Sequence, residues 1–249
     1  MRKTAIGGLM MMLSILVGSL TVWAAGNTYI NGIDANFPPF AYVDQTGKPA
    51  GLDVDAINWI AKKMGFQVTH QPMDWDGIIP SLNAKKIDFI ASGITITEER
   101  AQVVNFSIPY HKVENVFVAK ADSNLTVEEI QTKGGKIGIQ RGTSEAERIA
   151  EAKAKNNWAF ELVYYDSAPM AVGDVLNGRI IAAAMNDAPA QDAVKKQPVK
   201  IIGLCGIPAE EFGIAVRKED KNLLQMLNTG LKMLMADPYW QELKDKYMK

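Results

Sequence analysis

The stretch Ser92–Arg100 combines residue types that can hold a carboxylate. It reads Ser-Gly-Ile-Thr-Ile-Thr-Glu-Glu-Arg and follows the apolar run Ile87–Ala91, which predicts a buried strand. Thr97 suits the N-cap of a following helix, and the two glutamates after it suit the positive end of the helix dipole. Arg100 opposes that dipole, so we expect an anion near its guanidinium. Hydroxyls, an approachable glycine backbone, a helix N-terminus and a guanidinium together form a carboxylate cradle.

The alternative for Arg100 is a surface side chain that pairs with Glu98 or Glu99 across solvent. The stretch itself leaves both interpretations open. The choice depends on what other parts of the chain bring to the same place.

A second strand–loop–helix junction presents hydroxyls at a helix start. Lys136–Gln140 predicts a strand, and Thr143 and Ser144 follow where a helix begins, beside free backbone N–H groups. The loop is not a phosphate-binding loop of the Walker A type, because that motif needs two glycines and a Gly-Lys-Ser/Thr ending.

A single carboxylate, Asp187, ends the almost wholly apolar run 180–185 and its polar neighbour Asn186. An acid at the end of a buried strand indicates a position in a cleft. The alternative is a cap for the next turn, which Pro189 would start.

Two aromatic residues lie at junctions where a ligand could stack. Phe37 belongs to a proline-stiffened loop that begins with Asp34, after the strand candidate 29–33. Trp75 directly precedes a helix. Each is either an edge of the core or a stacking platform, whereas Phe40 fits the core better.

Strand and helix patterns alternate along the chain, which predicts an α/β architecture. The region 169–188 echoes the region 77–95, because each has a helix ending in Leu-Asn, a short basic turn and an apolar strand with a polar end. Two α/β lobes built alike would give this echo. Ligands bind at the carboxyl ends of strands in such sheets, where the polar candidates lie.

These candidates are together complementary to a zwitterionic amino acid. Arg100 and the hydroxyls can hold an α-carboxylate, and Asp187 can hold an α-ammonium. Phe37 and Trp75 can enclose a side chain between them.

The composition is that of a globular protein. The chain has 249 residues, is 47% hydrophobic and 22% charged, and carries a formal net charge of −1, which gives no indication of nucleic-acid binding. Its one cysteine, Cys205, cannot form an internal disulfide and is expected to be buried and inert. With two histidines in the chain, we expect no Cys/His metal cluster and no cofactor.

The N-terminus has the order of a secretory signal. Arg2 and Lys3 precede the apolar stretch 6–22, and small residues follow at Ala24 and Ala25. We therefore expect a signal peptide at 1–25, cleaved near Ala24 or Ala25. The alternative is an uncleaved membrane anchor of ~20 apolar residues, but the small-residue end and the soluble composition beyond it favour cleavage.

Four motifs resemble the bacterial extracellular (periplasmic) solute-binding proteins, family 3, which serve ABC importers for polar amino acids. The motifs are Gly51–Asp55, Asp74–Leu82, Ser92–Arg100 and Gly138–Thr143. The similarity covers essentially the whole mature chain in the same order, and Trp75–Arg100 is its specific part.

The resemblance implies a two-lobe periplasmic binding protein fold (type II), with two α/β lobes joined by a two-strand hinge. Residues 26–115 and 211–249 would form lobe 1, and residues 116–210 would form lobe 2. The hinge strands would lie near 116–119 and 212–215.

The resemblance also implies a set of ligand-binding residues. They are Asp34, Phe37, Trp75, Ser92, Gly93, Thr95, Arg100, Gln140, Thr143, Ser144, Asn186 and Asp187. Arg100 would bind the α-carboxylate, with the hydroxyls of the second junction reaching across from the other lobe, and Asp187 would bind the α-ammonium. Asp34, Gln140 and Asn186 include no basic residue, so we expect a polar or basic amino acid over an acidic one.

The implied function is to bind a free amino acid in the cleft and deliver it to the membrane permease of an ABC importer. The protein would be a periplasmic monomer that is not an enzyme. A cyclohexadienyl dehydratase-like enzyme on the same scaffold is the alternative, but it needs a general acid or base, and no His or Lys falls among the candidates. A third possibility is the sensor domain of a membrane receptor. The chain ends at Lys249 after its last helix, so a sensor would need a separate partner.

Overall fold

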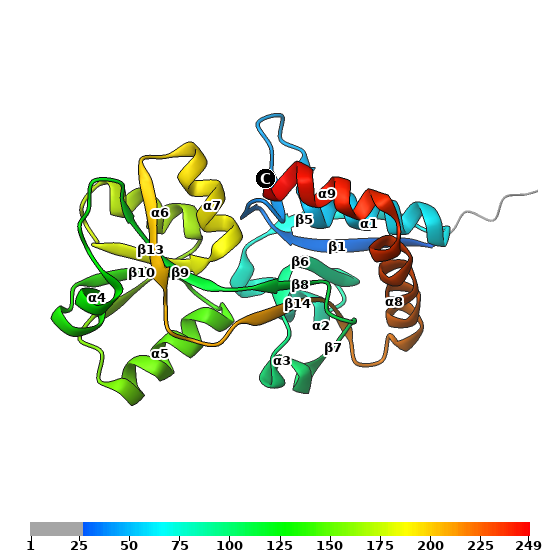
Figure 1. The fold of residues 1–249 in the computed structure, drawn as a ribbon. Helices are drawn as coiled ribbons and strands as arrows, with labels where there is room; N and C mark the ends of the chain where they lie inside the picture. The colour runs from blue at the N-terminus through cyan, green and yellow to red at the C-terminus, as the bar shows by residue number, and fades with distance from the viewer. Residues whose placement is uncertain (1–26) are drawn as a thin grey trace, which may run out of the picture.

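The computed structural model describes residues 27–249, and Figure 1 shows their path. The expected signal peptide and its cleavage near Ala24 or Ala25 lie outside the described residues. Within 27–249, no helix is both long and apolar enough to cross a membrane. The described chain forms two α/β lobes, each on its own sheet, and strands β9 (Asn115–Lys120) and β14 (Glu210–Arg217) lie where the chain passes between them.

The first lobe is built on a six-stranded sheet with the order β5-β1-β6-β14-β7, in which β8 also pairs with β14. The strands are β1 (Thr28–Asp34), β5 (Gln67–Met73), β6 (Phe89–Thr95), β7 (Val104–Phe106) and β8 (His111–Val113). A small sheet of β2 (Asn36–Phe37), β3 (Ala41–Val43) and β4 (Pro49–Ala50) lies in the same lobe. All seven residues of β6 are buried, as in a central strand. The strand begins at Phe89 and continues to Thr95, past the predicted end at Ala91, so Ser92 and Gly93 lie within it.

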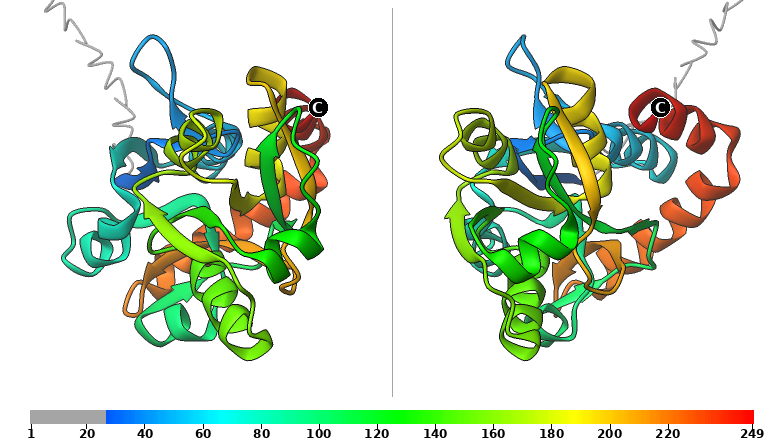
Figure 2. Two further views of the ribbon diagram at one scale, coloured as in Figure 1. Left: turned by 90° about the vertical axis from the view of Figure 1, so that its left-hand side faces the viewer. Right: turned by 60° about the vertical axis from the view of Figure 1, so that its left-hand side comes forward.

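Five helices belong to the first lobe. They are α1 (Leu52–Met64), α2 (Ile78–Asn83), α3 (Glu98–Val103), α8 (Lys221–Ala236) and α9 (Pro238–Met248), and a 3₁₀ turn at Trp75–Gly77 precedes α2. Helix α8 buries Leu223, Leu227, Leu231 and Leu234 on one stripe. Helices α8 and α9 pack against α1, so the end of the chain returns to the lobe in which the described part begins, as Figure 2 also shows.

The second lobe is built on a five-stranded sheet with the order β11-β10-β12-β9-β13. Its other strands are β10 (Lys136–Gln140), β11 (Glu161–Tyr165), β12 (Ala182–Asn186) and β13 (Val199–Leu204). Its helices are α4 (Val127–Lys133), α5 (Ser144–Asn156), α6 (Ala168–Leu176) and α7 (Asp187–Lys196). Successive residues of β9 and β12 belong to two separate apolar clusters, which places a core on each face of the sheet.

The two sheets repeat one strand order. In β5-β1-β6-β14 and in β11-β10-β12-β9, three parallel strands are followed by an antiparallel one. Strands β6 and β12 occupy the same place, which explains the echo between the regions 77–95 and 169–188. The two-lobe α/β prediction is confirmed, while the lobe boundaries at 115/116 and 210/211 stay a prediction.

Candidate functional site

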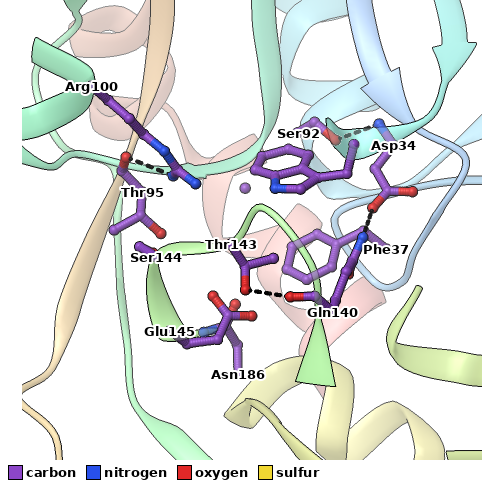
Figure 3. A pocket seen from close by; sticks show the side chains of 12 residues that line it. Asp34, Phe37, Ser92, Thr95, Arg100, Gln140, Thr143, Ser144, Glu145 and Asn186 are labelled. Atoms are coloured by element: carbon purple, nitrogen blue, oxygen red, sulfur yellow. Dashed lines mark hydrogen bonds between the residues drawn. The ribbon is translucent and has the colours of Figure 1, made fainter. Parts of the chain in front are cut away.

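The carboxyl ends of the central strands of both sheets meet at a pocket between the lobes (Figure 3). Four lining residues are the last residues of their strands: Asp34 of β1, Thr95 of β6, Gln140 of β10 and Asn186 of β12. The pocket is lined by Asp34, Phe37, Trp75, Ser92, Gly93, Thr95, Arg100, Gln140, Thr143, Ser144, Glu145 and Asn186. This is the place that the strand order of an α/β sheet favours for a ligand.

Every residue of the predicted set lines this pocket except Asp187. Asp187 is the half-buried first residue of α7, and its Oδ1 accepts a hydrogen bond of 2.9 Å from the N–H of Ala188. That contact agrees with the alternative of a local role at a helix start. The ligand-binding roles of all these residues remain predictions.

Arg100 is held at the start of α3. Thr97 Oγ1 accepts the Arg100 N–H at 3.1 Å, which confirms Thr97 as the N-cap. The guanidinium donates to the carbonyl of Thr95 at 3.2 Å and to that of Gly142 at 3.1 Å, and it lies 5.6 Å from the centre of the Trp75 ring. Arg100 is 8% exposed, so it is not a surface group paired with Glu98 or Glu99 across solvent.

The charge of Arg100 faces the pocket without a fixed carboxylate partner among residues 27–249. Burial lowers its pKa from the usual value, and nearby acids, Glu145 first among them, oppose that change. A guanidinium has five N–H donors, of which two bind the carbonyls of Thr95 and Gly142. The remaining donors suffice for a bidentate contact with a carboxylate.

Ser92 and Gly93 help to position the part of the pocket wall that contains Asp34 and Phe37. Ser92 Oγ accepts the Asp34 N–H at 2.9 Å, and Asp53 Oδ2 accepts the Gly93 N–H at 2.6 Å. Gly93 has a φ of 60°, and a Cβ there would collide with the ring of Phe37. Phe37 also stacks on Phe40 with ring centres 5.6 Å apart, so it is both an edge of the core and a wall of the pocket.

Hydrogen-bond acceptors dominate the pocket near Asp34. Gln140 Nε2 donates to Asp34 Oδ2 at 2.8 Å and to the carbonyl of Asp166 at 3.3 Å. With its amide hydrogens used in this way, Gln140 has its carbonyl oxygen left to offer. Burial raises the pKa of Asp34, and the hydrogen bond from Gln140 opposes that change.

The second predicted junction is built as expected. Thr143 Oγ1 accepts the Ala146 N–H at 3.3 Å as the N-cap of α5, and it donates to the carbonyl of Gln140 at 2.8 Å. The hydroxyl of Ser144 is buried and has no hydrogen-bond partner in the described part of the chain. A buried hydroxyl without a partner costs about 1–3 kcal/mol, so this group favours a polar ligand atom beside it.

Glu145 is a pocket residue that the sequence interpretation missed. It is 5% exposed, and burial raises its pKa to about 7, with Glu210 adding to the rise and Arg100 opposing it. An acid in the first turn of a helix is ordinarily explained by the dipole. No signal in the sequence therefore separated Glu145 from Glu147, the other acid in that turn.

Several contacts cross the pocket from lobe to lobe. The carbonyl of Gly142 accepts hydrogen bonds from Trp75 Nε1 at 2.9 Å and from Arg100, and Gln140 reaches Asp34 at the other end. Gly142 has a φ of +68°, and a Cβ there would collide with the carboxylate of Asp76. The lobes thus touch at both ends of the pocket.

Metal and thiol chemistry have no visible basis in the described residues. Within 27–249, no group of three or more His, Cys, Asp or Glu side chains could hold a metal ion. Cys205 is buried, as predicted, and burial raises its pKa well above the usual value.

Comparison with known proteins gives a consistent result. Residues 29–249 match the family model for bacterial extracellular solute-binding proteins, family 3. An L-arginine-binding protein from Pseudomonas aeruginosa is 34% identical over 99% of this chain and 96% of its own length.

Two solved structures extend the comparison. An ancestral arginine-binding protein bound to arginine has 34% identity and a TM-score of 0.81, over 90% of this chain and 100% of its own. An ancestral amino acid-binding protein, described as a precursor of cyclohexadienyl dehydratase, has 31% identity and a TM-score of 0.80, over 90% of this chain and 96% of its own.

Proposed function

Because this chain belongs to the bacterial extracellular solute-binding proteins, family 3, we propose that it binds a free amino acid between its lobes and delivers it to an ABC importer. One observation carries the proposal: a buried guanidinium faces a pocket whose other charged side chains are carboxyl groups. An amino acid carries a carboxylate that can bind the guanidinium and an ammonium group that can bind the carboxyl groups. The similarity to an L-arginine-binding protein supports this class of ligand.

In this proposal Arg100 binds the α-carboxylate, and the hydroxyls of Ser144 and Thr95 lie beside it. Trp75 and Phe37 enclose the aliphatic part of the ligand, since both line the pocket with little exposure. The α-ammonium binds among the acceptors of the second lobe, where Asn186 lines the pocket and Asp187 follows it at the start of α7.

The ligand side chain is polar or basic. Asp34 and the carbonyl oxygen of Gln140 are acceptors, and a basic side chain supplies several donors to them. An acidic side chain would bring a carboxylate against Asp34, which costs free energy in a buried site.

Calorimetric titration with arginine, lysine, glutamine and glutamate tests this proposal. We expect arginine or lysine to bind with the lowest Kd and glutamate with the highest. As a matched control, Asp34→Asn should weaken arginine binding about tenfold and glutamine binding less, because a charge-assisted hydrogen bond is worth about 1.5–3 kcal/mol. Tightest binding of glutamate would contradict the assignment.

The partner in this proposal is the membrane permease of an ABC importer, and the compartment is the periplasm. The protein acts as a monomer without nucleic acid. Co-purification with the membrane permease of an ABC importer, and light scattering of the purified protein, test these two points.

A second candidate function rests on Glu145. A buried carboxyl group with a pKa of about 7 at the pocket has the property that a general acid needs at neutral pH. Glu145 supplies the general acid or base that a cyclohexadienyl dehydratase-like enzyme needs and that the predicted site residues lacked. A precursor of cyclohexadienyl dehydratase is among the similar structures. Turnover of prephenate or arogenate, followed by product absorbance with Glu145→Gln as control, decides it. Absence of turnover leaves binding as the function.

A further inference from the structure

A chain of polar side chains leads from the pocket to the first residues of β9 and β14, near the points where the chain passes between the lobes. Asn186 Nδ2 donates to Asn115 Oδ1 at 2.8 Å, and Asn115 Nδ2 donates to Glu210 Oε2 at 3.2 Å. Arg148 Nε of α5 lies 3.0 Å from Glu210 Oε1. Asn115 is the first residue of β9 and Glu210 is the first residue of β14. We call these four side chains the crossing network.

The crossing network is almost entirely removed from water. Asn186 is 3% exposed and Asn115 is 1% exposed, and the side chain of Glu210 is 0% exposed. A buried carboxylate is tolerated when it is paired and hydrogen-bonded. Arg148, with 37% of its side chain exposed, supplies the opposite charge from the rim, and Asn115 supplies the hydrogen bond.

A carboxylate accepts hydrogen bonds and donates none, so Glu210 gives the network a direction. Asn115 must turn its NH₂ group toward Glu210 and its carbonyl toward Asn186. Asn186 must then turn its NH₂ group toward Asn115. The orientation of an asparagine amide follows from its partners, and no residue in the described range donates to Asn186 Oδ1.

We propose that Glu210 is a positioning residue that sets the orientation of Asn186, so that the pocket offers its ligand a hydrogen-bond acceptor at Asn186. Glu210 does not touch the ligand itself. The inference rests on the proposed function, and it narrows the ligand to one that places an N–H donor beside Asn186, from its α-ammonium or from a basic side chain.

Glu210→Gln tests the proposal because it keeps the shape of the side chain and changes the direction of the hydrogen bonds in the crossing network. The new glutamine can point its carbonyl at Arg148 and its NH₂ group at Asn115, which reverses both asparagines. Asn186 then presents NH₂ to the ligand, and we expect the Kd for arginine to rise about tenfold to a hundredfold. The fold, followed by circular dichroism, should be retained.

A control variant and the effect on Glu145 distinguish a reversal of the asparagines from a general effect of the lost charge. Glu211→Gln makes the same charge change one residue away on the same strand, at an exposed position, and should leave the Kd unchanged. Glu210→Gln also removes a charge that raises the pKa of Glu145. That change favours ionised Glu145 and tighter binding of a cation, so it cannot cause the expected loss.

Asn186→Asp separates orientation from packing. In the Glu210→Gln background, the new carboxylate accepts from the reversed Asn115 and still offers an oxygen to the ligand, so most of the affinity should return. In the wild-type background it places an acceptor against Asn115 Oδ1 and should not improve binding. Equal effects in the two backgrounds would mean no coupling and would overturn the proposal.

A ligand-free measurement keeps the outcome distinct from that of the proposed function. In ¹⁵N-labelled protein, Glu210→Gln should shift the side-chain NH₂ resonances of Asn115 and Asn186 and speed the hydrogen exchange of the Asn186 group, whereas Glu211→Gln should not. Unchanged resonances of both asparagines overturn the inference. Failure of the wild type to bind any amino acid overturns the proposed function and leaves this test intact.

Discussion

The junction before α3 in the first lobe and the junction before α5 in the second lobe begin in the same way. Each follows a buried strand and each has a threonine N-cap, Thr97 or Thr143, that accepts the N–H three residues later. Within the first turn they diverge, because the first brings Arg100 into the pocket and the second brings Glu145. One local construction thus presents opposite charges to the two sides of the same pocket.

Burial affects these two charges in opposite directions on the pKa scale. It lowers the pKa of Arg100, which stays charged since a guanidinium does not lose its proton in proteins. It raises the pKa of Glu145 to about 7, within reach of physiological pH. The side of the pocket that carries Arg100 is therefore permanently charged, whereas the side that carries Glu145 can respond to pH.

The largest expected effect comes from removing the permanent charge. Arg100→Ala should raise the Kd for any amino acid about a hundredfold or more, because a buried charge-assisted contact is lost. Arg100→Lys should weaken binding less severely, since it keeps the charge and loses the planar fork. Calorimetry measures both, and an unchanged Kd in Arg100→Ala would refute the carboxylate cradle.

The second effect is a pH dependence of the free energy of unfolding that arises from Glu145. The pKa of Glu145 is raised from 4.5 to about 7 by burial, so its contribution to stability is present below pH 4.5 and lost as the pH rises through 7. At about 1.4 kcal/mol per pKa unit, the free energy of unfolding should fall by about 3 kcal/mol over that range. In the Glu145→Gln variant the free energy of unfolding should fall less between these pH values, as measured by urea unfolding at pH 5 and pH 8.

A second buried acid, Asp53, contributes a pH dependence of stability in the same direction as Glu145. The pKa of Asp53 is also raised to about 7 by burial, so some pH dependence should persist in Glu145→Gln. Parallel pH curves for the wild type and Glu145→Gln would show that Glu145 does not titrate in this range.

A third and smaller effect concerns binding. Above pH 7, Glu145 is ionised and attracts a cationic ligand, so arginine affinity should rise up to about tenfold between pH 6 and pH 8. Glu145→Gln should make the affinity nearly independent of pH. Glutamine, whose side chain is neutral, should respond less than arginine in the wild type.

The smallest effect compares the two caps. Thr97→Ala and Thr143→Ala should each lower the free energy of unfolding by about 1 kcal/mol, the usual value of an N-cap. Thr97→Ala should also weaken binding, since it loosens the turn that holds Arg100. Thermal unfolding with and without arginine measures both, and equal losses of ligand-induced stabilisation in the two variants would contradict the distinction.

Most of the fold and most of the pocket were predictable from the sequence. The apolar runs identified β6 and β12, and polar residues at the ends of such runs, such as Thr95 and Asn186, could be assigned to one edge because strand ends meet there. The roles of the aromatics were not decided locally, since Phe37 contacts both the core and the pocket.

The remaining features depend on contacts that no local pattern encodes. Glu145 has the sequence environment of an ordinary helix start, yet it is buried and lines the pocket. Asn115 meets Glu210 across 95 residues of chain, although β9 and β14 belong to different sheets and do not pair with each other. For Asp187 the sequence left two alternatives open, a position in the cleft or a cap; its Oδ1 accepts the Ala188 N–H at the start of α7, and its role toward a ligand stays a prediction.

Gly142 has a consequence for the conformational populations of the protein. Its carbonyl accepts hydrogen bonds from donors of the other lobe, and its φ of +68° is a backbone conformation that residues other than glycine rarely adopt. A larger residue would strain this loop and displace the carbonyl from its donors, so that the arrangement in which the lobes touch would form a smaller fraction of the ensemble. The apparent Kd rises in inverse proportion to the fraction of molecules competent to bind. Affinity could therefore be adjusted at this position without altering any atom that the ligand touches.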